Sequence, residues 1–137
     1  MSWILLALIG AIFAALVAIF GKVGLQGIDT TLATTVRAVI MAAFLIAVSF
    51  SMGKINFASL PQGRALFFIT LSGIAGALSW LAMFAALKMG PAPSVAAIDR
   101  TSVVFVLIFS LLFLGTQFTW KALLGAVFIT LGAMLMV

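Results

Sequence analysis

The sequence predicts an all-α membrane protein, in which five transmembrane helices form one bundle within a single domain of residues 1–137. Hydrophobic residues make up 66% of the chain, charged residues make up only 7%, and the mean hydropathy is +1.46. A soluble domain has about a quarter of its residues charged, so these few charges cannot cover a surface that faces water. The apolar residues also form continuous runs of roughly 20, the length that a helix needs to cross a bilayer.

Glycine and charged residues bound the first two expected spans. The first is expected at about residues 3–20, because a glycine-rich segment and then Asp29 form a turn behind it. The second is expected at about residues 31–52, and it is followed by a polar loop that runs from Lys54 to Arg64.

The strongest stop signal in the chain separates the third and fourth expected spans. The third, at about residues 65–87, contains no charge and is followed by Pro91 and Pro93, which cannot continue a helix without losing a backbone hydrogen bond. The fourth span is expected at about residues 94–114 and the fifth at about residues 120–137. The short connections leave no linker and no soluble domain, so one compact helical bundle is predicted.

Most enzyme chemistry is excluded by residue types that the chain lacks. It contains no cysteine and no histidine, which removes disulfides, thiol nucleophiles, imidazole bases and the usual metal clusters. It also has no tyrosine and only two acidic residues, so it offers no paired acid and base. We therefore expect no catalytic residues, no metal and no cofactor. The basic residues behind the net charge of +5 are spread singly, which predicts contact with the lipid bilayer and no nucleic-acid partner.

Positive charge is nearly balanced between the two sides of the membrane. With five spans, the boundary charges divide three to two, and counting Arg37 and Arg100 makes the division three to four. The positive-inside rule then gives no orientation. One interpretation is that the chain inserts both ways and pairs as an antiparallel homodimer, because transporters commonly place their site between two inverted halves. The alternative is a single orientation set by features that a charge count misses.

Three ionisable residues lie deeper in the expected spans than the boundary charges. Arg37 lies about six residues into the second span, and Asp99 and Arg100 lie about six residues into the fourth, or roughly 9 Å along each helix. Such residues are costly in lipid and often mark a substrate path. In the structural alternative, Asp99 lies near the positive amino end of its helix, an arginine balances it, and both arginines extend to the headgroups.

Small polar residues recur at helical spacing on two of the expected spans. The face on the fourth span comprises Asp99, Ser102, Val106 and Ser110, and the face on the third comprises Ser72, Gly76, Ser79 and Met83. Together they could line a weakly polar cavity, whereas Ser72 and Gly76 equally fit close helix packing. Trp80 and Met83 suit either an apolar substrate pocket or the core of the bundle. A seam of small residues on the fifth span predicts a helix interface, that of a dimer being one option: Gly125, Ile129, Gly132 and Met136.

Several short motifs occur in a fixed order along the whole chain. They are Ile19-Phe20-Gly21-Lys22-Val23-Gly24-Leu25, Thr35-Val36-Arg37, Ser79-Trp80, Ala86-Leu87-Lys88-Met89-Gly90-Pro91, Ala97-Ile98-Asp99-Arg100 and Leu112-Phe113-Leu114-Gly115. In these motifs the sequence resembles a single five-span EamA domain of the drug/metabolite transporter superfamily. The resemblance implies a multi-pass inner-membrane protein that forms half of a ten-helix transporter fold, because longer relatives carry two such domains in opposite orientations. One departure is that family members commonly have glutamate after the Leu-Gly pair, whereas this chain has Thr116 and Gln117.

The leading functional hypothesis is a secondary carrier that moves a small organic metabolite or drug by alternating access. Arg37 would attract an anionic group of the substrate or fix Asp99, and Asp99 would bind a coupling proton or a cation. One alternative is small-multidrug-type efflux of lipophilic cations, although the first span lacks the carboxylate that this type needs. Another is a non-transporting membrane subunit, or a partner of a related chain in a heteromer.

Overall fold

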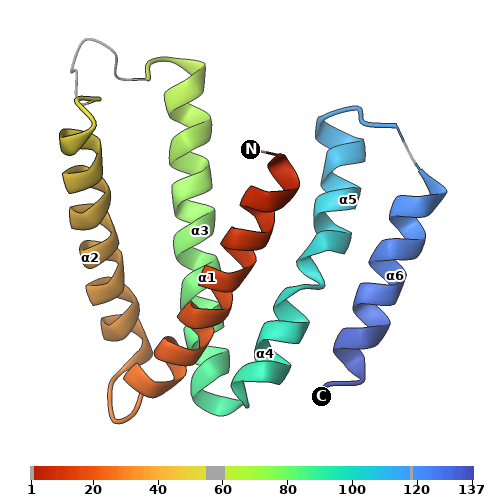
Figure 1. Cartoon of the computed structure of the whole chain (residues 1–137), viewed down its shortest axis with the longest axis horizontal. Coiled ribbons are helices and arrows are strands. Elements are labelled where there is room, and N and C mark those ends of the chain that lie inside the picture. Colours follow the sequence, from red (N-terminus) through yellow and green to blue (C-terminus); the bar gives the residue numbers. More distant parts are fainter. Residues whose placement is uncertain (1, 55–60, 118) are drawn as a thin grey trace. The chain divides into compact units, whose positions relative to one another are not determined.

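The structure is a computed structural model that describes residues 2–54, 61–117 and 119–137, and within these ranges all regular secondary structure is helical. The fold class predicted from the sequence is therefore confirmed. The expected loop between the second and third spans includes residues 55–60, which lie outside the described residues. The helices of the described residues, labelled in Figure 1, are α1 (Trp3–Gly24), α2 (Thr30–Ser51), α3 (Arg64–Met89), α4 (Ala92–Asp99), α5 (Ser102–Phe113) and α6 (Trp120–Met134).

Four segments of the described chain are long and apolar enough to cross a membrane. They are α1, α2, α3 and the segment Ala92–Phe113, which contains both α4 and α5. The fourth expected span therefore corresponds to two shorter helices. The fifth corresponds to α6, whose 15 residues extend about 22 Å at the α-helical rise. That length is less than the hydrocarbon core of a typical bilayer.

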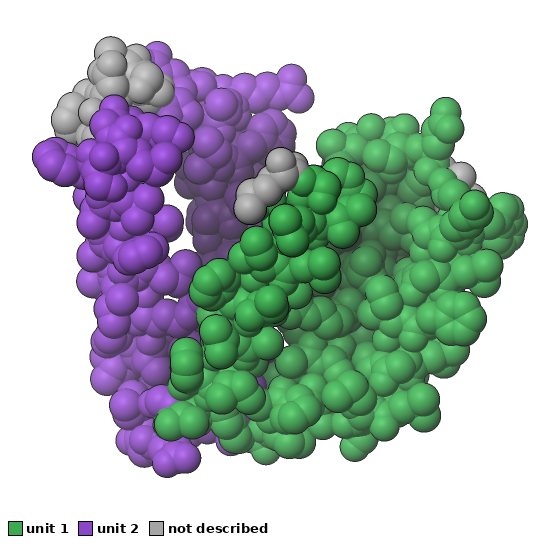
Figure 2. All heavy atoms as spheres, viewed as in Figure 1, with its two compact units in different colours: residues 1–23, 89–137 green, residues 24–88 purple. Residues whose placement is uncertain are grey.

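The chain divides into two compact units, which Figure 2 shows in different colours. The first unit comprises the chain up to Val23 together with Met89–Val137. In this unit α6 packs against both α4 and α5, and the side chains of Ala126 and Ala133 are each only 5% exposed. The Ser94 hydroxyl of α4 donates a hydrogen bond of 2.6 Å to the Met136 carbonyl, which ties the end of the chain to the start of α4.

The second unit, Gly24–Lys88, contains α2 and α3. Asp29 begins α2 as its N-cap, because its carboxylate accepts hydrogen bonds from the backbone N–H groups of Thr31 (2.9 Å) and Leu32 (3.0 Å). The turn before it requires Gly27, whose φ of 74° is unfavourable for other residues. The expected turn at Asp29 is thus built from a cap and a glycine.

Two lysines at the expected membrane boundary bind loop carbonyl groups. Within the first unit, Lys22 Nζ donates to the carbonyl of Gly90 at 2.8 Å. Within the second unit, Lys88 Nζ donates to the carbonyl of Ile28 at 3.0 Å. Both bonds satisfy carbonyl groups of residues that lie between helices.

Large apolar side chains cover most of the helix surfaces. Phe13, Phe44 and Phe128, on three different helices, are between 62% and 71% exposed. Soluble proteins rarely expose extended apolar patches. The surface is therefore that of a protein solvated by lipid.

Candidate functional site

The fourth expected span is interrupted near its middle, at Arg100 and Thr101. The N–H of Thr101 bonds to the carbonyl of Ile98 (2.9 Å), and the N–H of Val104 bonds to that of Thr101 (2.9 Å). These bonds join residues three apart, so the chain makes a tight 3₁₀-type turn between the two α-helices. The Thr101 hydroxyl also donates to the Ile98 carbonyl at 2.7 Å, a side-chain contact that commonly bends helices.

Asp99 and Arg100 lie at this interruption. Asp99 is the last residue of α4, Arg100 is its C-cap, and Ser102 is the first residue of α5. All three side chains are exposed. The Asp99 carboxylate has no hydrogen bond or ion pair with any residue that the structure describes. The face predicted for Asp99, Ser102, Val106 and Ser110 assumed a continuous helix. In the structure a turn at Arg100 and Thr101 separates Asp99 from the other three residues, and their shared role stays a prediction.

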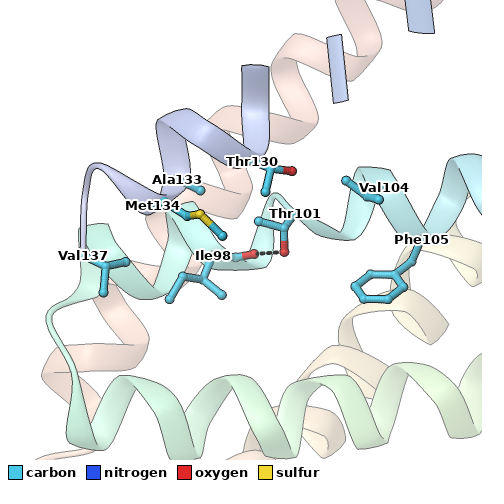
Figure 3. A pocket seen from close by; sticks show the side chains of 8 residues that line it. All are labelled: Ile98, Thr101, Val104, Phe105, Thr130, Ala133, Met134 and Val137. Carbon is cyan, nitrogen blue, oxygen red and sulfur yellow. Dashed lines mark hydrogen bonds between the residues drawn. The ribbon is translucent and has the colours of Figure 1, made fainter. Parts of the chain in front are cut away.

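An apolar pocket of about 520 Å³ opens beside the interruption (Figure 3). It is lined by Ile98, Thr101, Val104, Phe105, Thr130, Ala133, Met134 and Val137. The hydroxyls of Thr101 and Thr130 donate to carbonyls of their own segments, so the pocket offers mainly hydrocarbon surface to an occupant. Sequence reasoning missed this pocket, because its lining comes from α4, α5 and the α6 end of the chain, whose pairing no local pattern reveals.

A second cluster lies within the other unit, between α2 and α3. The guanidinium carbon of Arg37 lies over the Trp80 ring, 3.6 Å from its centroid, and 5.7 Å from the centroid of Phe84. The two rings meet edge to face, with centroids 5.7 Å apart. Arg37 and Trp80 are half-buried, whereas Phe84 is only 4% exposed. The structure thus brings together two residues that the sequence singled out separately, and adds Phe84, which follows Trp80 by one helical turn.

The other candidates on α3 have fewer contacts. Ser72 and Ser79 are exposed, whereas Met83 is half-buried. At Gly76, no heavy atom of another described segment lies within 4 Å of where a Cβ would be. No close helix approach is therefore seen at this glycine within the described chain. The substrate and packing roles of these residues stay predictions.

The predicted seam on α6 lies beside the face that packs within the chain. Gly125, Ile129 and Gly132 are exposed, and so is Met136 beyond the helix end. The packed face is formed instead by Ala126 and Ala133, each one position further along. The role of the seam as a helix interface stays a prediction.

At the departure from the family pattern, the main chain closes the turn after α5. Gly115 has a φ of 61°, and the N–H of Thr116 donates to the Ser110 carbonyl at 3.4 Å. The side chains of Thr116 and Gln117 are exposed. The turn thus forms without a carboxylate.

The apolar helices, their lipid-type surface and the interrupted span define a multi-pass membrane protein. Residues 1–137 match the model of the EamA-like transporter family. A protein of a Sinorhizobium species, described as "Uncharacterized transporter in cobO 3'region", is 43% identical over 135 residues, covering 98% of this chain and 96% of the relative. No solved structure matches the chain significantly. The chain belongs to the EamA-like transporter family, as its motifs indicated, and the family points to a transporter rather than an enzyme.

Proposed function

We propose that the protein is a secondary carrier, which moves a small organic metabolite or drug across the inner cell membrane by alternating access. The observation that carries this proposal is the interruption of the fourth span beside Asp99, the only acidic residue within an apolar span. Carriers commonly build their sites at such breaks, where helix ends and unwound backbone offer polar groups inside the membrane.

Asp99 is the proposed coupling group. Its carboxylate is exposed and unpaired among the described residues, so it is free to take up a proton or a cation. An ionisable residue inside a membrane often marks the path of a proton or an ion. Arg100, next in the chain, and Ser102 are proposed to adjust the local charge and to donate hydrogen bonds during this uptake.

The pocket beside the break supports a small organic substrate. Its volume of about 520 Å³ lies within the range of about 300–1,000 Å³ that is usual for small-molecule sites. In the second unit, we propose Ser79 and Met83 of α3 as separate substrate contacts. Ser72 and Gly76 are proposed to support helix packing.

The working unit is proposed to be a dimer of two inverted halves. The exposed seam of Gly125, Ile129 and Gly132 supports this assembly, because small residues let membrane helices approach closely. The match over nearly the full length of a relative described as a transporter also supports transport by chains of this size. A heteromer with a related chain of opposite orientation is the alternative assembly.

The proposal is tested by measuring proton movement into proteoliposomes that enclose a pH-sensitive dye. Benzoate, an amino acid, an amine and tetraphenylphosphonium are each added under an imposed pH gradient. We expect wild-type protein to couple proton movement to at least one of these compounds, and Asp99→Asn to abolish that coupling. The matched control is Asp29→Asn, which removes the only other acidic side chain but keeps an amide oxygen that can cap α2.

The outcomes separate the remaining functions. If Asp99→Asn moved protons with the added compound as wild-type protein does, the proposed coupling role of Asp99 would be wrong. Proton movement with tetraphenylphosphonium alone would favour the efflux of lipophilic cations. If proton movement were the same in liposomes with and without the protein for every compound, transport by this chain alone would be contradicted. This result would favour a subunit that needs a partner.

A further inference from the structure

We infer that the guanidinium of Arg37, held against Trp80 and Phe84, binds the oxyanion of a carboxylate or phosphate group. If the proposed function is correct, this inference gives the carrier an organic anion as its substrate. The site lies wholly within the second unit. It differs from the apolar pocket beside Asp99, which lies wholly within the first.

The location of Arg37 requires a compensating group. Arg37 lies seven residues after the first residue of α2, or about 10 Å along the helix. A charged side chain at such a depth is costly, and it normally pairs with an opposite charge or a polar group. The Trp80 ring supplies part of this compensation, because the negative face of an aromatic ring attracts a cation.

No carboxylate of the second unit neutralises Arg37. The only acidic residue in the sequence of this unit is Asp29. Its carboxylate caps the start of α2, eight residues before Arg37 and about 12 Å away along the helix. Arg37 itself forms no hydrogen bond or ion pair with any described residue of the second unit. Within this unit, its positive charge and its N–H groups are therefore available to an anion.

Stacking on Trp80 does not use the hydrogen-bond donors of the Arg37 guanidinium. A distance of 3.6 Å between Cζ and the Trp80 centroid indicates flat stacking, because an edge-on approach would put guanidinium nitrogens between the two. The N–H groups then point outward in the plane of the group, parallel to the ring. This plane is the one in which arginine binds carboxylate or phosphate with two parallel hydrogen bonds. Trp80 and Phe84 thus fix the orientation of the donors without using them.

Arg64 provides a contrast within the same unit. Its guanidinium carbon is 5.7 Å from the Phe68 centroid, and it is the exposed first residue of α3. It is an arginine of the membrane boundary, where water and headgroups solvate the charge. A matched pair of variants can therefore separate the Arg37 site from the general effect of removing an arginine.

Binding is measured by the fluorescence of Trp80 in full-length protein carrying Trp3→Phe and Trp120→Phe, in nanodiscs of phosphatidylcholine. The probes are benzoate and its neutral analogue benzamide, which share a ring and differ in charge. We expect benzoate to change the fluorescence saturably and benzamide to have a much smaller effect. No response to benzoate, or an equal response to benzamide, would overturn the inference without any Arg37 variant.

The variants locate the binding group. Arg37→Gln is expected to weaken benzoate binding about tenfold or more, the loss expected for a charge-assisted pair of hydrogen bonds. Arg37→Lys, which keeps the charge but loses the planar fork, should bind more weakly than wild type and more tightly than Arg37→Gln. Arg64→Gln should bind like wild type. If Arg64→Gln and Arg37→Gln weakened benzoate binding equally, the effect would be one of general surface charge. The inference of a site at Arg37 would then be overturned.

Nanodiscs that also contain phosphatidylglycerol identify the source of the oxyanion. If the site takes a soluble anion, benzoate binds equally with and without this anionic lipid. If phosphatidylglycerol suppresses the benzoate response through Arg37, the oxyanion is that of a lipid headgroup, and an organic anion as substrate is overturned. The binding measurement does not depend on transport. Benzoate binding without transport would contradict only the proposed carrier function. Transport without benzoate binding would contradict only the proposed site at Arg37.

Discussion

Asp29 and Asp99 are the two acidic residues of the chain, and their surroundings differ. Asp29 lies outside the spans, and its carboxylate accepts two backbone hydrogen bonds at the start of α2. Asp99 lies inside a span and has no partner among the residues that the structure describes. The same side chain is therefore a structural cap in one position and a candidate for exchange chemistry in the other.

The cap at Asp29 predicts a measurable loss of stability on truncation. We expect Asp29→Ala to lower the free energy of unfolding by about 1 kcal/mol, because two N–H groups at the start of α2 lose their acceptor. Thermal unfolding of the purified protein in detergent measures the change. Asp29→Asn should retain most of the stability. Equal unfolding temperatures for Asp29→Ala and wild type would contradict a capping role.

The sequence identified some residues of the Arg37 cluster but not their arrangement. Arg37 was conspicuous as a charge in an apolar run, and Trp80 as a large aromatic beside small residues. Their contact joins α2 to α3, so it depends on tertiary packing that no local spacing specifies. A signal for Phe84 was present, because residues four apart on a helix lie on the same face. This spacing does not show that Phe84 belongs to the cluster unless the position of Arg37 is known.

Hydropathy predicted the helices well and their interruptions poorly. The expected boundaries of the first three spans agree with α1, α2 and α3 to within a few residues. The break in the fourth span was not predicted, because residues 94–114 contain neither glycine nor proline. The helix-bending contact is a hydrogen bond from Thr101 to the main chain, which composition does not reveal.

The break predicts that Thr101→Ala shifts the fourth span towards a straight helix. Loss of one hydrogen bond of about 1 kcal/mol changes the ratio of bent to straight forms about fivefold. Spin labels on cysteines that replace Val95 and Phe109 report the change, since a straight helix separates these positions by about 21 Å along its axis. Thr101→Ser keeps the hydroxyl and serves as the control. The same distance distribution in Thr101→Ala and wild type would contradict a role for the hydroxyl in the break.

The EamA-like family and the apolar surface together establish a membrane protein of the transporter class. Within the described chain, α6 packs through Ala126 and Ala133 and leaves the glycine seam exposed. An exposed seam of small residues is the kind of surface through which a second chain could pack as the other half of a transporter. The near balance of positive charge allows that half to be an inverted copy.

Dual insertion predicts that the end of the chain is found on both sides of the membrane. The chain contains no cysteine, so a cysteine added after Val137 gives a signal without background. We expect an impermeant thiol reagent to label about half of the molecules in intact cells, since no charge bias favours either orientation. Labelling after permeabilisation gives the total. Labelling from one side alone would exclude an antiparallel homodimer and direct the search to a partner chain or a parallel assembly.

The short α6 links this protein to the thickness of its bilayer. A helix of 15 residues, or about 22 Å, is shorter than the hydrocarbon core of about 30 Å. Where such a helix crosses the bilayer, the lipid beside it thins or flanking side chains extend to the headgroups, at a cost of fractions of a kcal/mol for each ångström of mismatch, unless a neighbouring protein surface replaces the lipid. The free energy of this mismatch falls when two α6 helices cover one another. Thicker membranes would therefore favour the assembled form, and lipid composition becomes a physical control on assembly.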